Sequence, residues 1–173
     1  MIRVVAGAFR GRRLDVPAGI RPTTELTRKA AFDILGPSVV DAAVLDAAAG
    51  SGAYGIEALS RGAASAVFVE SSSRVARTLR ANLERLGDGR SLLLVETVSL
   101  YLMRGSETFD VIFHDPPYDA DSDEDLAGLL TRLAPGGVLF HERGEGLGPP
   151  GVPAADERRY GATRLFIYRK ESW

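Results

Sequence analysis

The sequence predicts an α/β fold in which a mostly parallel sheet of seven strands is covered by helices on both faces. Seven short runs along the chain fit strands, and the first five of them are mainly apolar, as expected of strands in a largely buried sheet. Helical patterns separate the first five runs, which favours parallel pairing. Only YGAT joins the last two runs, so they should form an antiparallel hairpin at one edge of the sheet.

An amino-terminal extension precedes this alternation. The runs IRVVAG and RRLDVP flank a glycine-containing turn and predict a small β-hairpin. A helix should then begin at Thr23 or Thr24 and end at Gly36 and Pro37, because such residues are typical of helix boundaries. Its expected apolar face includes Leu26, Ala30 and Ile34.

The rest of the chain alternates strands with helices as far as the carboxyl-terminal hairpin. Residues 143–153 are rich in glycine and proline and predict a flexible loop without a helical crossover. The expected strands cover residues 42–47, 65–70, 91–96, 109–115, 137–142, 155–160 and 163–169, and the expected helices cover residues 53–61, 72–86, 97–103 and 122–133.

Length and composition limit the kinds of protein that this chain can form. A chain of 173 residues, 45% of them hydrophobic, is long enough for one domain that buries about two thirds of its unfolded surface. We therefore expect a single domain over 1–173, with an extension over 1–36 and a core over 37–173. No run approaches the roughly 18 apolar residues of a membrane span, and no signal peptide is evident, so a cytoplasmic protein is expected. Nothing indicates an obligate dimer, which favours a monomer.

Metal and thiol chemistry have little support in the sequence. Cysteine is absent, which excludes disulfides, thiolate nucleophiles and cysteine zinc sites. The two histidines, His114 and His141, are few for a histidine metal site. No metal ion is therefore expected.

Charge is distributed unevenly, although the formal net charge is only −2. Residues 1–30 contain seven arginines or lysines against two acidic residues and so carry +5, which leaves −7 on the remaining chain. A basic segment on an acidic body suits the phosphate backbone of a nucleic acid. A solvated charged face is the simpler alternative.

A glycine-rich turn follows the first predicted strand of the core. The stretch LDAAAGSGAYG places glycines at positions 50, 52 and 55, in the spacing of dinucleotide-binding loops. Gly50 and Gly52 allow a tight turn and let backbone amides approach a ligand closely. A tight strand-to-helix turn without a ligand is the alternative.

Glu70 ends the next predicted strand, 20 residues after Gly50. An acidic side chain at this place can accept hydrogen bonds from both hydroxyls of a ribose. The alternative is a cap for the following helix. The serines at 71–73 can supply that cap, which leaves Glu70 freer to bind a ligand.

The strand FDVIFHD runs into an acidic and aromatic turn, DPPY, at residues 115–118. If Asp115 and the carbonyl of Pro116 each accept one N–H of a conjugated amine, the nitrogen lone pair can face an electrophile. Tyr118 would stack on the planar ring of the target, which stabilises binding by roughly 1 to 3 kcal/mol per base. A proline turn with Asp115 as a helix cap is the alternative.

Together these elements resemble the class I S-adenosylmethionine-dependent methyltransferases, which have a Rossmann-like fold, and more closely the RsmD family of 16S rRNA guanine-N2 methyltransferases. The resemblance covers nearly the whole chain and rests on AGAFRGRRLDVP, RPTTELTRKAAFDIL, LDAAAGSGAYGIEALSRGA, FHDPPY and RRYGATRLFIYR. The glycine turn and DPPY are shared with methyltransferases of other amines, whereas RGRRL and RPTTELTRKA are more specific to this family.

The resemblance implies methyl transfer from S-adenosyl-L-methionine, with S-adenosyl-L-homocysteine as product, to the N2 amine of one guanine of the position-966 type in 16S rRNA, within an assembling or assembled small ribosomal subunit. The residues implied to bind the cofactor are Asp46, Ala48, Gly50, Ser51, Gly52, Glu70, Ser71, Thr97, Val98 and Asp115. Those implied to form the target-amine site are Asp115, Pro116, Pro117 and Tyr118. Those implied to face or position RNA are Arg10, Arg12, Arg13, Arg21, Thr23, Thr24 and Arg28.

The chain departs from the family pattern at several positions. Thr97 and Val98 stand where the family usually has Asp or Asn followed by Ala, so recognition of the adenine amine would depend on backbone groups. His114 stands where the family more often has an apolar residue, and we interpret it as a structural histidine. The alanines at 47–49 replace a bulkier pair, which could loosen the pocket wall.

Three alternatives remain open. A methyltransferase of adenine N6 or of protein glutamine would use the same amine site, but such enzymes typically need further recognition segments. An RNA-binding assembly factor without turnover would not need Gly50, Gly52, Glu70 and Asp115 to be intact. A nicotinamide oxidoreductase would use the glycine turn but would leave DPPY unexplained.

Overall fold

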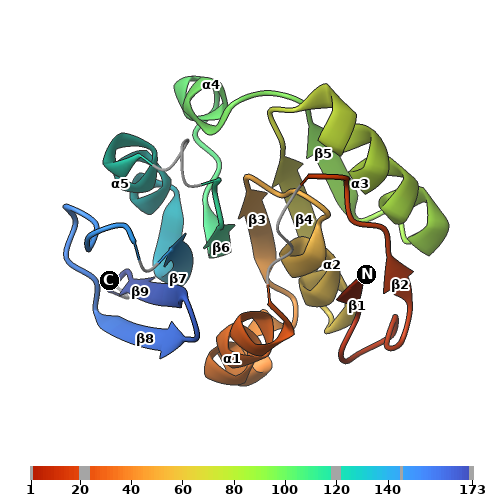
Figure 1. Cartoon of the computed structure of the whole chain (residues 1–173), viewed down its shortest axis with the longest axis horizontal. Coiled ribbons are helices and arrows are strands. Elements are labelled where there is room, and N and C mark those ends of the chain that lie inside the picture. Colours follow the sequence, from red (N-terminus) through yellow and green to blue (C-terminus); the bar gives the residue numbers. More distant parts are fainter. Residues whose placement is uncertain (1, 20–23, 118–121, 145, 172–173) are drawn as a thin grey trace.

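The computed structural model describes residues 2–19, 24–117, 122–144 and 146–171 (Figure 1). Within these residues, seven strands form one sheet in the order β5 (Ser91–Leu94), β4 (Ser65–Val69), β3 (Ala43–Ala47), β6 (Phe109–His114), β7 (Leu133–Gly144), β9 (Thr163–Arg169) and β8 (Asp156–Tyr160). The strands from β5 to β7 are parallel, and β9 pairs antiparallel with both β7 and β8. The predicted sheet with its antiparallel carboxyl-terminal hairpin is therefore confirmed.

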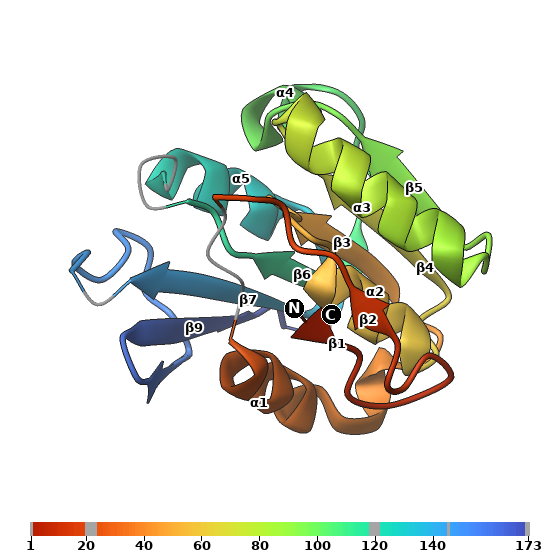
Figure 2. The same ribbon diagram turned by 45° about the vertical axis from the view of Figure 1, so that its right-hand side comes forward.

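Helices cover both faces of the sheet (Figures 1 and 2). They are α1 (Glu25–Leu35), η1 (Gly36–Val39, a 3-10 helix), α2 (Ala53–Ser60), α3 (Ser73–Leu86), α4 (Val98–Met103) and α5 (Asp123–Thr131). On one face α1, α2 and α3 pack around Phe32, Ile56 and Leu79. On the other face α4 and α5 pack around Tyr101 and Leu126. Among the described residues, none of these helices has the length and apolar character needed to cross a membrane.

The amino-terminal extension forms the predicted hairpin and helix. Strands β1 (Ile2–Arg3) and β2 (Arg13–Leu14) pair antiparallel, and α1 follows them. Thr24 caps α1, because its side chain accepts a hydrogen bond from Thr27 N at 3.1 Å. The predicted start at Thr24 is therefore confirmed, while Thr23 lies outside the described residues.

The predicted apolar face of α1 is wrong at Leu26 but correct at Ile34, which packs against the hydrophobic core. Leu26 is 59% exposed, and Ala30 and Ile34 are only partly buried. The buried residues of the helix are Thr27, Arg28, Ala31, Phe32 and Leu35. The helix is rotated in this way because Phe32 packs on Phe113 of β6, with ring centroids 5.4 Å apart.

The carboxylate of Glu57 on α2 links the extension to the core. It accepts hydrogen bonds from Val5 N at 2.8 Å and from Ala6 N at 3.0 Å. It also pairs with Arg61 Nε at 2.8 Å and lies 3.8 Å from Arg28 Nε. Burial lowers the pKa of the Arg28 guanidinium, whereas the charge of Glu57 opposes this shift. One buried carboxylate thus satisfies two backbone amides and balances a buried cation.

Strand β7 is longer than predicted. It begins at Leu133 and ends at Gly144, so it includes the first residues of the predicted loop 143–153. Pairing with β9 continues to the end of β7, and Arg143 forms an ion pair with Asp123 at 3.0 Å. The bounds of the other core elements differ from the predicted ones by two residues or fewer, a difference typical of helix and strand ends.

Replacing Glu57 with alanine should lower the free energy of unfolding by about 3 to 5 kcal/mol, because it leaves a buried guanidinium without its counter-charge. Urea denaturation followed by circular dichroism measures this change. Asp33→Ala is the control, since it removes only an exposed ion pair with Lys29 and should change the same free energy by less than about 1 kcal/mol. Similar small losses in both variants would contradict the role given to Glu57.

Candidate active site

Three strands end side by side at one edge of the sheet. β3 pairs in parallel with β4 on one side and with β6 on the other (Figure 1). The chain runs from β3 outward to β5 and then returns to β6, so the order of the strands reverses at β3 and β6. Ligands of open α/β sheets bind at such a reversal. The glycine turn, Glu70 and Asp115 follow β3, β4 and β6, so the fold brings these three predicted features together.

The glycine turn after β3 has a backbone that favours small residues. Gly50 and Gly52 have φ values of 56° and 80°, and Ala48 has a φ of 64°, which is uncommon for a residue with a side chain. A Cβ on Gly52 would collide with Leu79 of α3. A Cβ on Gly50 would meet no described atom within 4 Å. Gly50 therefore borders open space, from which a ligand can approach its backbone.

The Glu70 carboxylate holds the glycine turn in place. Its Oε2 accepts from Gly50 N at 2.9 Å, and its Oε1 accepts from Ser72 N at 2.8 Å. Ser72 caps α3 as expected, while Ser71 is exposed. Because both of its oxygens accept hydrogen bonds from the backbone, Glu70 has fewer acceptor positions for a ligand than the sequence predicted. Because each carboxylate oxygen offers two acceptor positions, it can still bind two hydroxyl groups of a ligand.

Asp46 lies buried beneath the glycine turn. It is 3% exposed, and its Oδ2 accepts from Gly55 N at 2.8 Å. Burial raises the pKa of Asp46 to about 8, and the charges of Asp115 and Glu70 add to the shift. Three carboxyl groups thus share one environment, which favours ligand groups that are cationic or donate hydrogen bonds. Ser51, also predicted for this site, is buried within the turn.

The described residues after β6 differ in their exposure to solvent. Asp115 is partly exposed, Pro116 is buried and Pro117 is exposed, while Tyr118 lies outside the described residues. The alternative of Asp115 as a helix cap is wrong, because Ser122 caps α5 and accepts from a backbone amide at 3.0 Å. Asp115 is thus not required for the start of α5.

The two residues expected to recognise the adenine amine contribute to the fold instead. Thr97 caps α4 by accepting from a backbone amide at 3.1 Å, and Val98 is buried. The preceding residue, Glu96, was not predicted; it is buried and pairs with Arg104. Its other oxygen, Oε1, has no hydrogen-bond partner among the described residues. Glu96 ends the run SLLLVE as Glu70 ends SAVFVE, and that similarity could have identified it.

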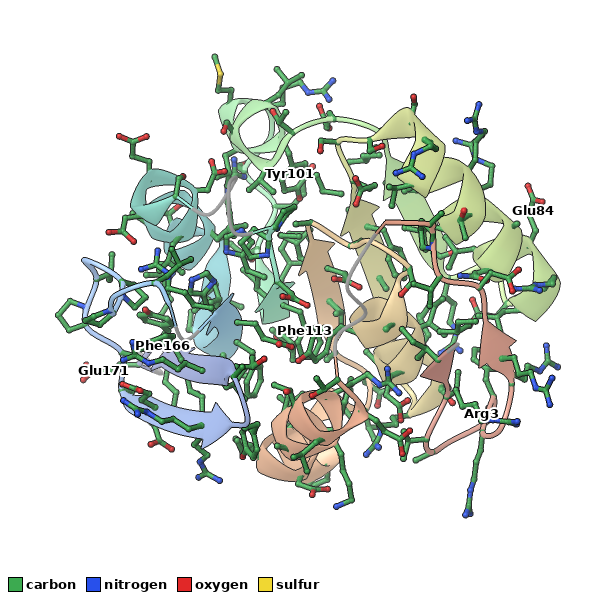
Figure 3. The ribbon with its side chains drawn as sticks, viewed as in Figure 1. Arg3, Glu84, Tyr101, Phe113, Phe166 and Glu171 are labelled. Atoms are coloured by element: carbon green, nitrogen blue, oxygen red, sulfur yellow. The ribbon has the colours of Figure 1, made fainter. Side chains whose placement is uncertain are left out.

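A buried pair of an aromatic and an acidic residue also went unpredicted. The Tyr54 hydroxyl donates to the Glu142 carboxylate, 88 residues further along the chain. The Tyr54 ring stacks on Phe113, which lies near the centre of the molecule, with centroids 4.5 Å apart (Figure 3). Burial, followed by the charges of Glu142 and Asp115, raises the pKa of Tyr54 well above its ordinary value. No local pattern in the sequence indicates a contact between α2 and β7.

The geometry of His114 agrees with a structural role. His114 is buried, and its ring stacks on His141 with centroids 5.0 Å apart. Burial, followed by the charges of His141 and Arg143, lowers the pKa of His114 well below its ordinary value, so the ring is neutral. Within the described part of the chain, no cluster of histidine, aspartate and glutamate residues has a geometry that could hold a metal ion.

Exposed arginines extend from the hairpin along α3. The hairpin presents Arg10, Arg12 and Arg13. Arg12 Nη1 donates to Arg85 O at 3.1 Å, which places these residues at the carboxyl end of α3. A second exposed row, which was not predicted, consists of Arg74, Arg77 and Arg80. Their spacing of three residues places them on one side of the helix and could have identified the row.

The prediction that Arg28 faces RNA is wrong. Arg28 is 1% exposed, and its Nη2 donates to Arg3 O at 2.7 Å. The side chain is a buried part of the link between α1 and the hairpin. Thr24 is engaged as the cap of α1, and Arg21 and Thr23 lie outside the described residues.

Comparisons with known proteins agree on one family. The sequence profile of the family described as Conserved hypothetical protein 95 matches residues 2–169. The chain is 36% identical over 180 residues to the ribosomal RNA small subunit methyltransferase D of Escherichia coli K12, covering 99% of this chain and 91% of that protein. It is 34% identical to the protein of the same name from Haemophilus influenzae, covering 82% and 78%. A solved structure of a hypothetical protein from Thermus thermophilus has a TM-score of 0.87 at 33% identity, covering 97% and 99%.

Asp46→Asn should make the stability of the protein less dependent on pH. The pKa of Asp46 rises from 3.8 to about 8 on folding, so the folded state binds more protons between these values. Stability therefore falls as the pH rises through this range, by up to about 1.4 kcal/mol per pH unit for one group. Urea denaturation at several pH values from 5 to 8 compares the two proteins, and equal slopes would contradict a protonated Asp46.

Proposed function

Because the chain belongs to the ribosomal RNA small subunit methyltransferase D (RsmD) family, we propose that it transfers a methyl group from S-adenosylmethionine to the N2 amine of one guanine in 16S rRNA. The observation that carries the proposal is the position of the glycine turn after β3 beside Asp115 and Pro116 after β6. Methyl transfer needs the nucleophile within about 3 to 3.5 Å of the methyl carbon. Adjacent strand ends can hold donor and acceptor in that relation.

The residues around the glycine turn fit the proposed cofactor. Gly50 borders open space and has a backbone that a larger residue would strain. The Glu70 carboxylate lies beside Gly50 and retains acceptor positions for the two hydroxyls of a ribose. When bound, the cofactor supplies a methyl group that its positively charged sulfur has already activated. The carboxylates of Asp115 and Glu70 near the buried Asp46 favour such a charge electrostatically.

Asp115 and Pro116 would bind the target amine. The exocyclic amine of guanine is a poor nucleophile because its lone pair is delocalised into the ring. If the Asp115 carboxylate and the Pro116 carbonyl each accept one N–H, the nitrogen becomes more pyramidal and its lone pair turns toward the methyl group. Asp115 can then take the proton that the amine releases after transfer, directly or through a water molecule.

The exposed arginines of the hairpin and of α3 would bind the RNA backbone. Arg12 contacts the carboxyl end of α3. Arg74 lies near the amino end of α3, and that end adjoins the site because the backbone amide of Ser72, the cap of α3, donates to Glu70. The helix has 14 residues, and at a rise of about 1.5 Å per residue it spans roughly 21 Å. The arginine row can therefore guide a strand of RNA from the hairpin to the edge of the sheet where the site lies.

Asp115→Ala should lower methyl transfer by about 100-fold or more, because it removes both an amine ligand and a proton acceptor. Incorporation of labelled methyl groups into 16S rRNA, and into the small ribosomal subunit, measures the rate. Mass spectrometry of the digested RNA should identify the product as N2-methylguanine. Isothermal titration should still find S-adenosylmethionine bound, because the glycine turn and Glu70 keep their positions.

Asp33→Ala, which removes an exposed carboxylate of α1, is the matched control and should keep full activity. Full activity of Asp115→Ala would remove this residue from the mechanism. No methyl incorporation by the unaltered protein into either substrate would leave the non-catalytic RNA-binding alternative.

The double substitution of Arg77 and Arg80 by alanine should weaken RNA binding and reduce its dependence on salt. Each lost phosphate contact should lower the slope of log affinity against log salt by roughly 0.7 for single-stranded RNA. Filter binding at several salt concentrations measures this slope.

The matched control replaces Arg158 and Arg159 of β8, which are exposed but paired with Asp156 and Glu157. Their loss should leave the slope unchanged. The same slope for both double variants would mean that the α3 arginines form only a solvated surface.

A further inference from the structure

Glu142 is a buried acidic residue to which the proposed mechanism assigns no task. It lies near the end of β7, is 5% exposed and accepts a hydrogen bond from the Tyr54 hydroxyl. Burying a carboxylate costs more free energy than burying an apolar side chain of similar size, unless its acceptor positions are satisfied. One hydroxyl occupies only one of about four such positions. A carboxylate can therefore accept several hydrogen bonds at once, of which the bond from Tyr54 is one.

The register of β6 and β7 brings Glu142 close to the end of β6, because the last pair of the two strands is His114 with His141. Phe113 is paired with Phe140, and their rings stack with centroids 5.6 Å apart. The next pair, His114 and His141, also stacks and therefore points to the opposite face. One residue further along β7, Glu142 returns to the face of the phenylalanine pair, and Asp115 directly follows the end of β6.

Tyr54 lies on that same face, since its ring stacks on Phe113. It approaches from α2, which begins at the end of the glycine turn. The charges of Glu142 and Asp115 both act on its hydroxyl. Glu142 is thus a second acidic group at the proposed amine site, on the side of β7 and away from the glycine turn.

Guanine presents two kinds of donor next to each other on one edge: the N2 amine and the N1–H. In adenine and cytosine the ring nitrogen next to the exocyclic amine is an acceptor instead. Enzymes that act on an unstacked base read this edge by hydrogen bonds. If Asp115 and the Pro116 carbonyl accept the amine hydrogens of guanine, the N1–H still needs an acceptor, and a buried donor without one is costly.

We propose that Glu142 accepts the N1–H of the target guanine and so makes the site selective for guanine over adenine and cytosine. The proposal rests on the proposed methylation of guanine N2 and names the group that selects this base. A carboxylate opposite the ring nitrogen of adenine or cytosine would face a lone pair, so neither group would be satisfied. The Tyr54 hydroxyl donates to the same carboxylate, and a carboxylate can accept from more than one donor.

An RNA substrate whose target guanine is replaced by 2-aminopurine tests the proposal. This base keeps the 2-amino group but has a lone pair at N1 instead of N1–H. The protein should methylate guanine RNA with a kcat/KM at least about tenfold above that for 2-aminopurine RNA, since a site built around a hydrogen bond rejects analogues that lack it. Glu142→Gln should reduce this preference by about tenfold, because the glutamine amide can donate to N1.

Tyr54→Phe is the matched control. It removes the hydrogen bond between α2 and β7 but keeps the carboxylate, so the preference for guanine should persist even where the overall rate falls. A merely structural role of Glu142 would lower kcat/KM for both RNAs by the same factor and leave their ratio unchanged.

The outcomes are distinct. An unchanged ratio in Glu142→Gln, or a ratio near one in the unaltered protein, overturns the assignment of Glu142 alone, and the second result does not depend on any variant being folded. Methylation of neither RNA by the unaltered protein overturns the proposed function and this assignment with it.

Discussion

Strand β3 forms hydrogen bonds with β4 on one side and with β6 on the other, and the position of every element of the site depends on this double pairing. Because both pairs are parallel, the chain leaves all three strands at the same edge of the sheet. The glycine turn and Asp115 are more than 60 residues apart in the sequence, yet they follow neighbouring strands. A shift of either strand by one residue would turn its side chains to the other face and separate these groups.

The same arrangement gathers acidic groups at one edge of the sheet. Asp46, Glu70 and Glu142 are buried there, and Asp115 is partly buried. The fold accommodates the buried groups in different ways. Asp46, whose pKa burial raises to about 8, is protonated below that pH. Backbone amides bind Glu70, and a tyrosine hydroxyl binds Glu142. Ligand groups that donate hydrogen bonds or carry positive charge fit such an edge, in keeping with the proposed cofactor and the proposed amine.

Buried contacts attach the basic extension to the acidic core. The carboxylate of Glu57 binds the backbone after β1 and balances Arg28 of α1, so two segments of the extension share one buried anchor on α2. The exposed arginines are thereby carried on a fixed surface along α3, not on a free arm. Phosphate contacts made from a fixed surface can orient a nucleic acid relative to the site as well as attract it.

Much of the fold and part of the site follow from the sequence by itself. Local periodicity and boundary residues determine where strands and helices lie, so the Thr24 cap, the turn at Gly50 and Gly52 and the end of β6 were predictable. The tertiary structure alone decided the buried face of α1, the burial of Arg28 and the bond between Tyr54 and Glu142. The physical reason is range: an element forms from residues a few positions apart, whereas the choice of which side chain is buried depends on surfaces supplied by distant parts of the chain.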